Sequence, residues 1–340
     1  MMKRRIAALT MAVAMAATMG MTAIAEETTE AATEAATEAA TEAAEEAAAP
    51  DIDVSGITLA YVPTTMNNPF WTAMMGGITA EMEALGMDPD SQLVTVDANS
   101  DQATMNNYVN DLIVQEVDAI ILAPMDTTAV TEALTACEEA GIPVINVDTP
   151  VDAADKVAAI IASDNYKAGV LCAEDMMSKL DEGAKIAIMN QPSGAACVDR
   201  EQGFLDTVGD YFEIVSTTDT SGDTAKTMTA AEDVLTADAD LAGFFCINDM
   251  GALGCVQACN AAGRTDVVIY GVDGNPDFMG YVEDGSATAS AAQQPSVIGS
   301  NAVDTAIAVL AGEEVEHDQV VDVELITADN ISEFDISDWQ

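Results

Sequence analysis

The sequence has few residues that catalyse reactions and no common nucleotide or hydrolase motif. His317 is the only histidine among 340 residues, and it lies in a Glu-rich stretch with little prospect of serving as a general base elsewhere. No Gly-x-Gly-x-x-Gly follows an expected strand, and neither a P-loop, a Gly-x-Ser-x-Gly elbow nor a calcium-binding loop is present. We therefore expect a non-enzymatic protein without cofactors.

The cysteines are also not spaced as metal ligands usually are. The six cysteines form no Cys-x-x-Cys pair, which argues against a zinc site. Most of them stand among apolar residues, where small buried thiols are typical. Cys255 and Cys259 could lie one helical turn apart, a spacing that is weak evidence for a disulfide.

Positive charge is scarce as well. The formal net charge is −49, and residues 26–340 contain 7 basic residues against 59 acidic ones, a charge of −52. Such a chain is a poor partner for nucleic acid and for anionic membranes. The acidity disfavours phosphorylated or polycarboxylate ligands, although it is also typical of a soluble surface in a salty habitat.

The N-terminus contains an export signal followed by a low-complexity segment. Three basic residues at positions 3–5 precede an apolar stretch that ends in Ala23-Ile24-Ala25, which predicts a signal peptide over residues 1–25, the rival being a retained membrane anchor. Residues 26–50 repeat Ala-Thr-Glu-Ala and cannot form a core, so we interpret them as an acidic tether. We expect export to the periplasm or to the outer face of the cytoplasmic membrane.

From residue 57 onward, short apolar runs alternate with amphipathic stretches, as in parallel α/β sheets. The runs at 57–62, 119–122, 144–147, 185–189, 242–247 and 267–271 predict strands, and 197–209, 224–236 and 249–262 predict helices. Two successive α/β sets result, with a change near Ser163.

Asn and Asp dominate the segments that follow these strands, where parallel sheets bind their ligands. The segments are Met66–Trp71, Pro124–Asp126, Asp148-Thr149, Asn248-Asp249 and Asp273–Asn275. Carboxylates and amides pair with hydroxyls, and the aromatic pair in the first segment can cover the C–H face of a ring, which favours a polyhydroxylated ligand. Each Asp or Asn could instead be a helix cap. Asp148 and Asp273 could also act as the acid and base of a glycosidase, a less favoured reading.

Several blocks resemble the type I periplasmic binding proteins of sugar transport, especially their ribose-binding members. The blocks are Met66–Trp71, Ile142–Asp148, Ile161–Asn165, Arg200–Phe204, Asn248-Asp249, Gly271–Gly274 and Ala292–Pro295. The resemblance implies two similar doubly wound parallel-sheet lobes joined by a three-crossing hinge near Ser163, Gln293 and Val321. The first lobe would comprise 52–162 plus 294–321, and the second 163–293 plus 322–340.

The same resemblance implies a ligand site between the lobes, which close around it by a hinge motion. Its residues would be Asn68, Phe70, Trp71, Asp148, Thr149, Arg200, Asn248, Asp273 and Gln293. The aromatics would stack on the sugar, the aspartates accept hydroxyls, and Arg200 donate from the second lobe. Ribose-binding members have an arginine in place of Thr149, an asparagine in place of Ala123 and an aromatic near Gly222, so the particular sugar stays open.

The expected function is capture of a small neutral sugar and its delivery to the permease of an ABC transporter, by a monomer. The alternative is a receptor for a sugar-like signal, such as an autoinducer or polyol, that serves chemotaxis or a sensor kinase. A sugar-modifying enzyme is less favoured. A repressor of the lactose-repressor type shares the fold but needs a basic helix-turn-helix that residues 1–50 lack.

Overall fold

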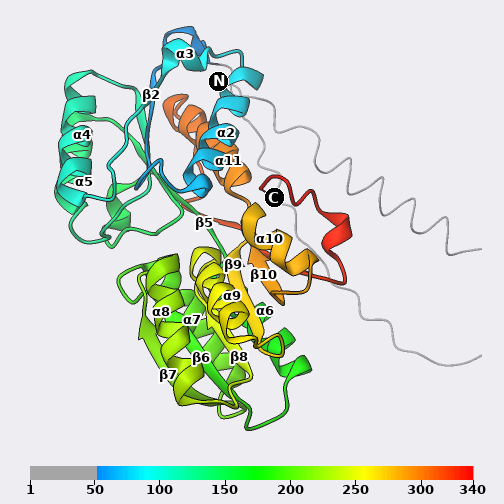
Figure 1. The fold of residues 1–340 in the computed structure, drawn as a ribbon. Coiled ribbons are helices and arrows are strands. Elements are labelled where there is room, and N and C mark those ends of the chain that lie inside the picture. Colours follow the sequence, from blue (N-terminus) through cyan, green and yellow to red (C-terminus); the bar gives the residue numbers. More distant parts are fainter. Residues whose placement is uncertain (1–51, 340) are drawn as a thin grey trace, which may run out of the picture. The chain divides into compact units, whose positions relative to one another are not determined.

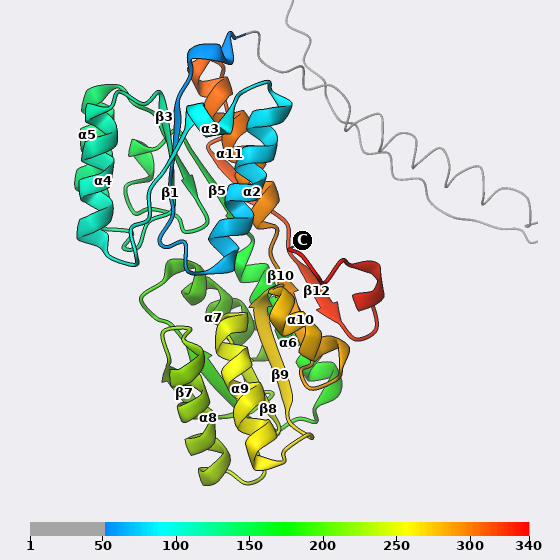
Figure 2. The same cartoon turned by 45° about the horizontal axis from the view of Figure 1, so that its top comes forward.

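The computed structural model describes residues 52–339, and the expected signal peptide and tether lie outside the described residues. Within this range helices and strands alternate, and they form two six-stranded sheets with helices on both faces (Figures 1 and 2). The predicted fold, two doubly wound parallel-sheet lobes, is confirmed. No helix in residues 52–339 combines the length and the apolar character needed to cross a membrane.

The first sheet is parallel throughout and has the order β11-β5-β4-β3-β1-β2. Its strands are β1 (Leu59–Val62), β2 (Leu93–Thr95), β3 (Ala119–Leu122), β4 (Val144–Val147), β5 (Ala159–Ser163) and β11 (Asp318–Val321). The helices of this lobe are α2 (Pro69–Ala84), α3 (Pro89–Gln92), α4 (Gln102–Val114), α5 (Thr131–Ala140) and α11 (Pro295–Leu310). One apolar cluster joins α2 and α11 to the sheet, and another joins α4 and α5 to it. All four residues of β1, β3 and β4 are buried, as strands covered on both faces require.

The second sheet has the order β12-β10-β9-β8-β6-β7, and only its β10–β12 pair is antiparallel. Its strands are β6 (Lys185–Asn190), β7 (Glu213–Asp219), β8 (Gly243–Cys246), β9 (Val268–Asp273), β10 (Ala289–Ala292) and β12 (Glu324–Thr327). The helices are α6 (Asn165–Lys179), α7 (Ala195–Val208), α8 (Thr224–Ala237), α9 (Asp249–Ala262) and α10 (Pro276–Glu283). Apolar clusters with α6 and α7 on one face, and α8, α9 and α10 on the other, bury this sheet. Short 3-10 helices add η1 (Val54–Gly56), η2 (Ala154–Lys156) and η3 (Ile331–Glu333).

The chain passes from one sheet to the other three times. The crossings run from β5 to α6, from β10 to α11 and from β11 to β12, so the predicted three-crossing hinge is confirmed. Polar contacts join these segments: the Asp164 N–H donates to the Val321 carbonyl, and Lys167 Nζ lies 2.6 Å from Asp322 Oδ1. The carboxyl ends of strands from both sheets therefore lead into one hinge region.

The C-terminal segment departs from the expected division into lobes. Ile331 and its neighbour Phe334 pack against the apolar cluster of the second lobe, to which residues 322–340 were assigned. Trp339, however, packs against the first-lobe cluster, and its ring meets the Phe70 ring edge-on with 5.5 Å between centroids. The end of the described chain thus contacts both lobes, because it carries apolar side chains that each core can bury.

Candidate functional site

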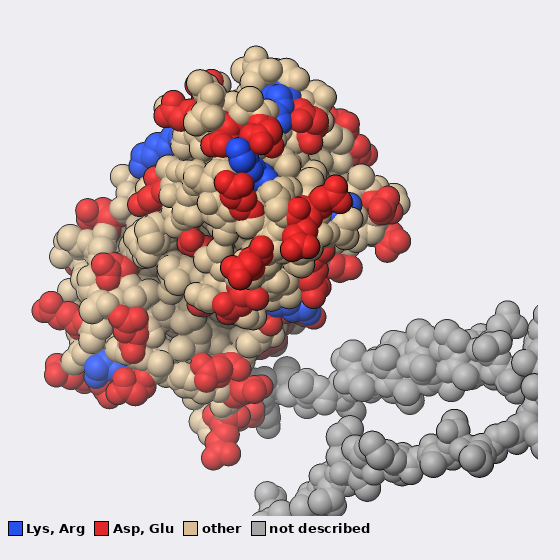
Figure 3. Space-filling view, turned by 90° about the horizontal axis from the view of Figure 1, so that it is seen from below, with Lys and Arg blue, Asp and Glu red and all other residues tan. Residues whose placement is uncertain are grey.

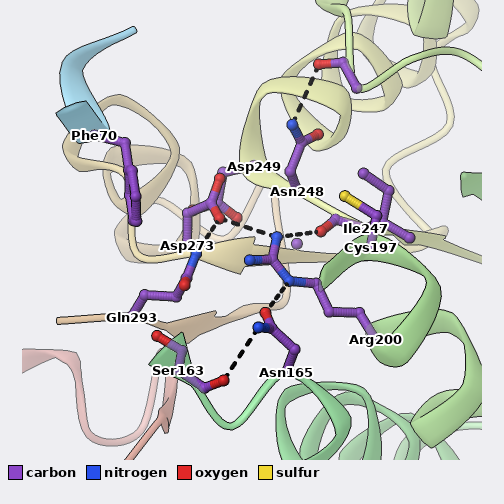
Figure 4. A network of polar contacts seen from close by, with 12 residues as sticks. Phe70, Ser163, Asn165, Cys197, Arg200, Ile247, Asn248, Asp249, Asp273 and Gln293 are labelled. Atoms are coloured by element: carbon purple, nitrogen blue, oxygen red, sulfur yellow. Dashed lines mark hydrogen bonds and ion pairs between the residues drawn. The ribbon is translucent and has the colours of Figure 1, made fainter. Parts of the chain in front are cut away.

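Arg200 anchors a buried polar network at the second lobe (Figure 4). Its side chain is 4% exposed; Nε donates to Asn165 Oδ1 at 2.7 Å, and Nη1 donates to the Ile247 carbonyl at 2.8 Å. The close approach of α6 and α7 places it there, because a Cβ on Gly169 would lie 2.0 Å from the Arg200 carbonyl oxygen. Nη2 makes no hydrogen bond within residues 52–339 and remains a donor for a ligand.

Asp273, the last residue of β9, forms an ion pair with Arg200. Its Oδ1 lies 3.2 Å from Arg200 Nη1 and accepts a hydrogen bond from Gln293 Nε2 at 2.7 Å. The residue has a positive φ of 137°, a strained conformation of the kind that clusters at functional sites. Burial raises the pKa of Asp273 to about 6, although the positive charge of Arg200 pulls it down.

Gln293 has hydrogen-bonding capacity that the protein leaves unused. Its side chain is 2% exposed, and its Nε2 donates to Asp273. Its buried Oε1 has no partner among the described residues. A buried amide oxygen without a partner costs free energy, so this atom is suited to accept a hydrogen bond from a ligand hydroxyl.

Asp249 supports the loop that carries Asp273. It is fully buried, accepts from the Asn275 N–H at 2.7 Å and receives the Ser290 hydroxyl at 2.8 Å. Gly271 leaves the room for it, because a Cβ there would lie 2.0 Å from Asp249 Oδ1. Burial raises the pKa of the Asp249 carboxyl well above its usual range, and the neighbouring charge of Asp273 adds to this effect. Sequence reasoning placed Asp249 after a strand but did not identify this supporting role.

Asp148 and Thr149 follow β4 of the first sheet. Asp148 is 8% exposed and has a left-handed φ of 66°. Its Oδ2 accepts from the Thr149 hydroxyl at 2.8 Å. Burial raises the pKa of Tyr61 well above its usual value, and the charge of Asp148 adds to this effect. Burial raises the pKa of Asp148 while the charge of Arg200, from the second lobe, lowers it. The two residues therefore interact electrostatically across the lobes.

The first loop places Asn68 and two aromatics at the start of α2. Asn68 caps that helix by accepting from the Phe70 N–H at 3.0 Å, the alternative role considered for such residues. Figure 4 shows Phe70 beside the network of Asp273 and Arg200. Trp71 is 7% exposed within the first-lobe core and contacts the Phe70 ring edge-on at 5.0 Å. Stacking of either ring on a ligand stays a prediction.

Asn248 caps helix α9 and also lies so close to Gly222 that a side chain at position 222 would clash with it. Its Oδ1 accepts from the Gly251 N–H at 2.9 Å, and its Nδ2 donates to the Gly222 carbonyl at 3.3 Å. A Cβ on Gly222 would lie 2.5 Å from Asn248 Nδ2 and 3.0 Å from Gln191 Oε1. The ribose-binding members were expected to have an aromatic near this position. In this chain the side-chain amides of Asn248 and Gln191 lie beside Gly222 instead.

Sequence reasoning gave no role to Asn165, which the structure places in the network. Asn165 is 6% exposed and positions Arg200 through the 2.7 Å hydrogen bond, while its Nδ2 donates to the Ser163 carbonyl. Its place directly after β5 was the available signal, since the other polar residues of the network also follow strands.

The six cysteines do not form a metal site or a disulfide. All six are free, and five are buried. Cys246 and Cys255 hold their sulfur atoms 3.5 Å apart, whereas Cys255 and Cys259 are not joined. Residues 52–339 contain no group of three or more His, Cys, Asp or Glu side chains arranged to hold a metal ion.

Comparison with known proteins identifies the family. Residues 59–314 match the model of the periplasmic binding protein domain. The ribose import binding protein of Bacillus subtilis is 33% identical over 260 residues, 76% of this chain and 83% of that protein. Its counterpart in Escherichia coli is 34% identical over 271 residues, 79% of this chain and 90% of that protein.

Solved structures give the same result. An ABC transporter solute-binding protein from Mycobacterium smegmatis with bound glycerol has a TM-score of 0.75 at 33% identity, covering 82% of this chain and 96% of that one. One from Agrobacterium vitis with bound D-fucose has a TM-score of 0.74 at 31% identity, covering 81% and 96%. This chain therefore belongs to the type I periplasmic binding proteins, among relatives that bind sugars for ABC transporters.

Proposed function

We propose that this protein is an exported monomer that captures a small neutral sugar and delivers it to the permease of an ABC transporter. The observation that carries the proposal is the buried Arg200–Asp273–Gln293 network, which leaves Arg200 Nη2 and Gln293 Oε1 for a ligand. A donor and an acceptor from two residues that both bond to Asp273 suit the hydroxyls of a sugar, each of which can donate and accept.

The two sheets supply complementary parts of this site. The second lobe supplies Arg200, Asp273, Asn248 and Gln293, and the first supplies Asp148, Thr149, Asn68 and the aromatics. A ligand that contacts both groups favours the state in which they are close, because only that state gains both sets of interactions. The relatives named for ribose import, and the structure with bound D-fucose, support a sugar as the ligand.

Binding without chemistry is part of the proposal. Asp148 and Asp273 lie near a guanidinium and amides that can hold hydroxyls, and the one histidine lies beside β11, bonded to the Ala154 carbonyl. The sugar should therefore leave the site unchanged.

A thermal-shift screen against D-ribose, D-allose, D-fucose, D-glucose and D-galactose tests this function, followed by calorimetry on each hit. A sugar at 100 times its dissociation constant stabilises the folded protein by about 2.7 kcal/mol, which is a clear rise in melting temperature. The Arg200→Ala variant should lose the response, and proton NMR should recover the sugar unaltered. Unchanged melting temperatures with every sugar, or conversion of a sugar, would contradict the proposal.

A further inference from the structure

Buried carboxyl groups outnumber buried cations in the candidate site. Three buried aspartates, Asp148, Asp249 and Asp273, share one buried cation, Arg200. Arg200 lies within ion-pair distance of Asp273 alone among the described residues, and its Nε and Nη1 are committed to Asn165, the Ile247 carbonyl and Asp273. Asp249 is surrounded by donors from the protein, namely the Asn275 N–H and the Ser290 hydroxyl. Among the three carboxylates, Asp148 therefore has the fewest hydrogen-bond donors from the described residues.

Asp148 has a single hydrogen-bond donor. The Thr149 hydroxyl donates to Oδ2 at 2.8 Å, and no Lys or Arg lies within 4.0 Å of the carboxylate among residues 52–339. A buried carboxylate is costly unless a cation or several donors offset the lost hydration. Burial raises the pKa of this carboxyl, although the charge of Arg200 and the Thr149 hydroxyl lower it. A positively charged ligand group would remove the cost.

An unpaired amide oxygen independently indicates that a ligand donates a hydrogen bond in this region. Gln293 Oε1 is buried without a partner, and the same side chain donates to Asp273. Asp148, Asp273 and Gln293 thus offer acceptor oxygens, while Arg200 Nη2 is the donor left in the network. A hydroxyl group can satisfy acceptors one at a time, but an ammonium offers three donors together with the missing charge.

We propose that Asp148 selects a sugar or polyol that carries a protonated amine, whose ammonium pairs with the Asp148 carboxylate. This inference rests on the proposed sugar-binding function, and it replaces the neutral ligand proposed there with an amino sugar or amino polyol. The remaining hydroxyls of the ligand bind Arg200, Asp273 and Gln293. The acidic side chains spread over the face in Figure 3 also attract cationic ligands during approach.

The test compares sugars that differ in one group. Calorimetry at pH 6.5 uses D-glucose with D-glucosamine, D-galactose with D-galactosamine, and D-mannose with D-mannosamine, because an amine of the α-amino kind, with a pKa of roughly 7.7 to 8.0, is protonated there. The N-acetyl form of each amino sugar keeps the nitrogen without the charge. We expect at least one amino sugar to bind tenfold or more tightly than its neutral partner, and its N-acetyl form to lose that advantage.

Variants assign the effect to Asp148. Asp148→Asn should bring the ratio of amine to neutral affinity close to one, and Thr149→Arg, which adds a cation beside Asp148, should reverse it. Asp152→Asn removes an exposed carboxylate four residues away and should keep the ratio. Thr149→Arg also serves if Asp148→Asn does not fold.

The possible outcomes separate the two proposals. The amine inference would be refuted if every neutral sugar bound as tightly as its amino partner, or if Asp148→Asn still bound an amino sugar more tightly than its neutral partner. Either result would leave the sugar-binding function intact. Failure of all the sugars to bind would contradict the sugar-binding function itself, and the inference with it.

Discussion

Replacing Asp273 with asparagine should make the unliganded protein more stable and a weaker binder. Asparagine keeps the Oδ1 acceptor for Arg200 Nη1 and Gln293 Nε2 but removes a buried negative charge. The raised pKa shows that the folded protein disfavours this charge even with Arg200 beside it. The strain and the charge are consistent with a site that binds its ligand at the expense of stability.

The magnitude follows from the pKa. Asp273 titrates at about 6 in the folded protein against a usual value of 3.8, and each unit corresponds to about 1.4 kcal/mol. Because the folded pKa is raised, the contribution to stability is fully present below about pH 4 and is lost as the pH rises through about 6. Asp273→Asn should therefore gain at most about 3 kcal/mol in free energy of unfolding at pH 7.5, and little at pH 4.

Urea unfolding of both proteins at pH 4, 5, 6 and 7.5 measures the difference. Asp304→Asn is the control, because partial desolvation and the nearby Glu81 also raise the pKa of Asp304 to about 6, but this residue is exposed on α11 and lies away from the network. It should leave ligand affinity unchanged, whereas Asp273→Asn should weaken it. If Asp273→Asn were less stable than the wild type at pH 7.5, or equally stable at every pH, our account of its buried charge would be wrong.

Three further predictions follow from the site and the core. Arg200→Ala should weaken sugar binding by roughly 2 to 4 kcal/mol in calorimetry, since it leaves buried acceptors unpaired; wild-type affinity would remove Arg200 from the site. Trp71→Ala should lower the free energy of unfolding by about 3 to 5 kcal/mol in urea, because the ring lies in the first-lobe core; an unchanged midpoint would contradict that placement. Deleting residues 26–50 should leave the melting temperature and the ligand affinity unchanged, because the composition of this segment does not allow it to pack on the core. A fall of several degrees in the melting temperature would refute this prediction.

Much of the fold could be predicted because buried parallel strands have a clear sequence pattern. The apolar runs at 119–122 and 144–147 coincide with β3 and β4, whose residues are all buried on both faces. Two other strands were harder to recognise. The edge strand β7 has exposed and half-buried residues along its length, and the interior strand β10 consists of alanine and serine. Neither has the continuous run of large apolar residues on which the prediction depended.

The candidate site could be predicted only as far as its residues follow strands. Asp148 directly follows β4 and Asp273 is the last residue of β9. Their type and position indicated that they bind hydroxyl groups. What the sequence does not show is which polar groups meet. The bond from Arg200 to Asn165 joins residues on two helices brought together by Gly169, a contact that depends on helix packing.

The end of the chain affects how ligand binding can be observed. The chain contains two tryptophans, Trp71 of the predicted site and Trp339 near the other end of the described residues. The structure places both tryptophans in edge-on contact with Phe70, Trp71 at 5.0 Å and Trp339 at 5.5 Å. The segment before Trp339 packs on the second-lobe core, so a change in the angle between the lobes must either carry Trp339 away from Phe70 or bend that segment. The fluorescence of Trp339 should therefore respond to movement of the lobes, whereas Trp71, held within one core, should respond only if a ligand binds beside Phe70 as predicted.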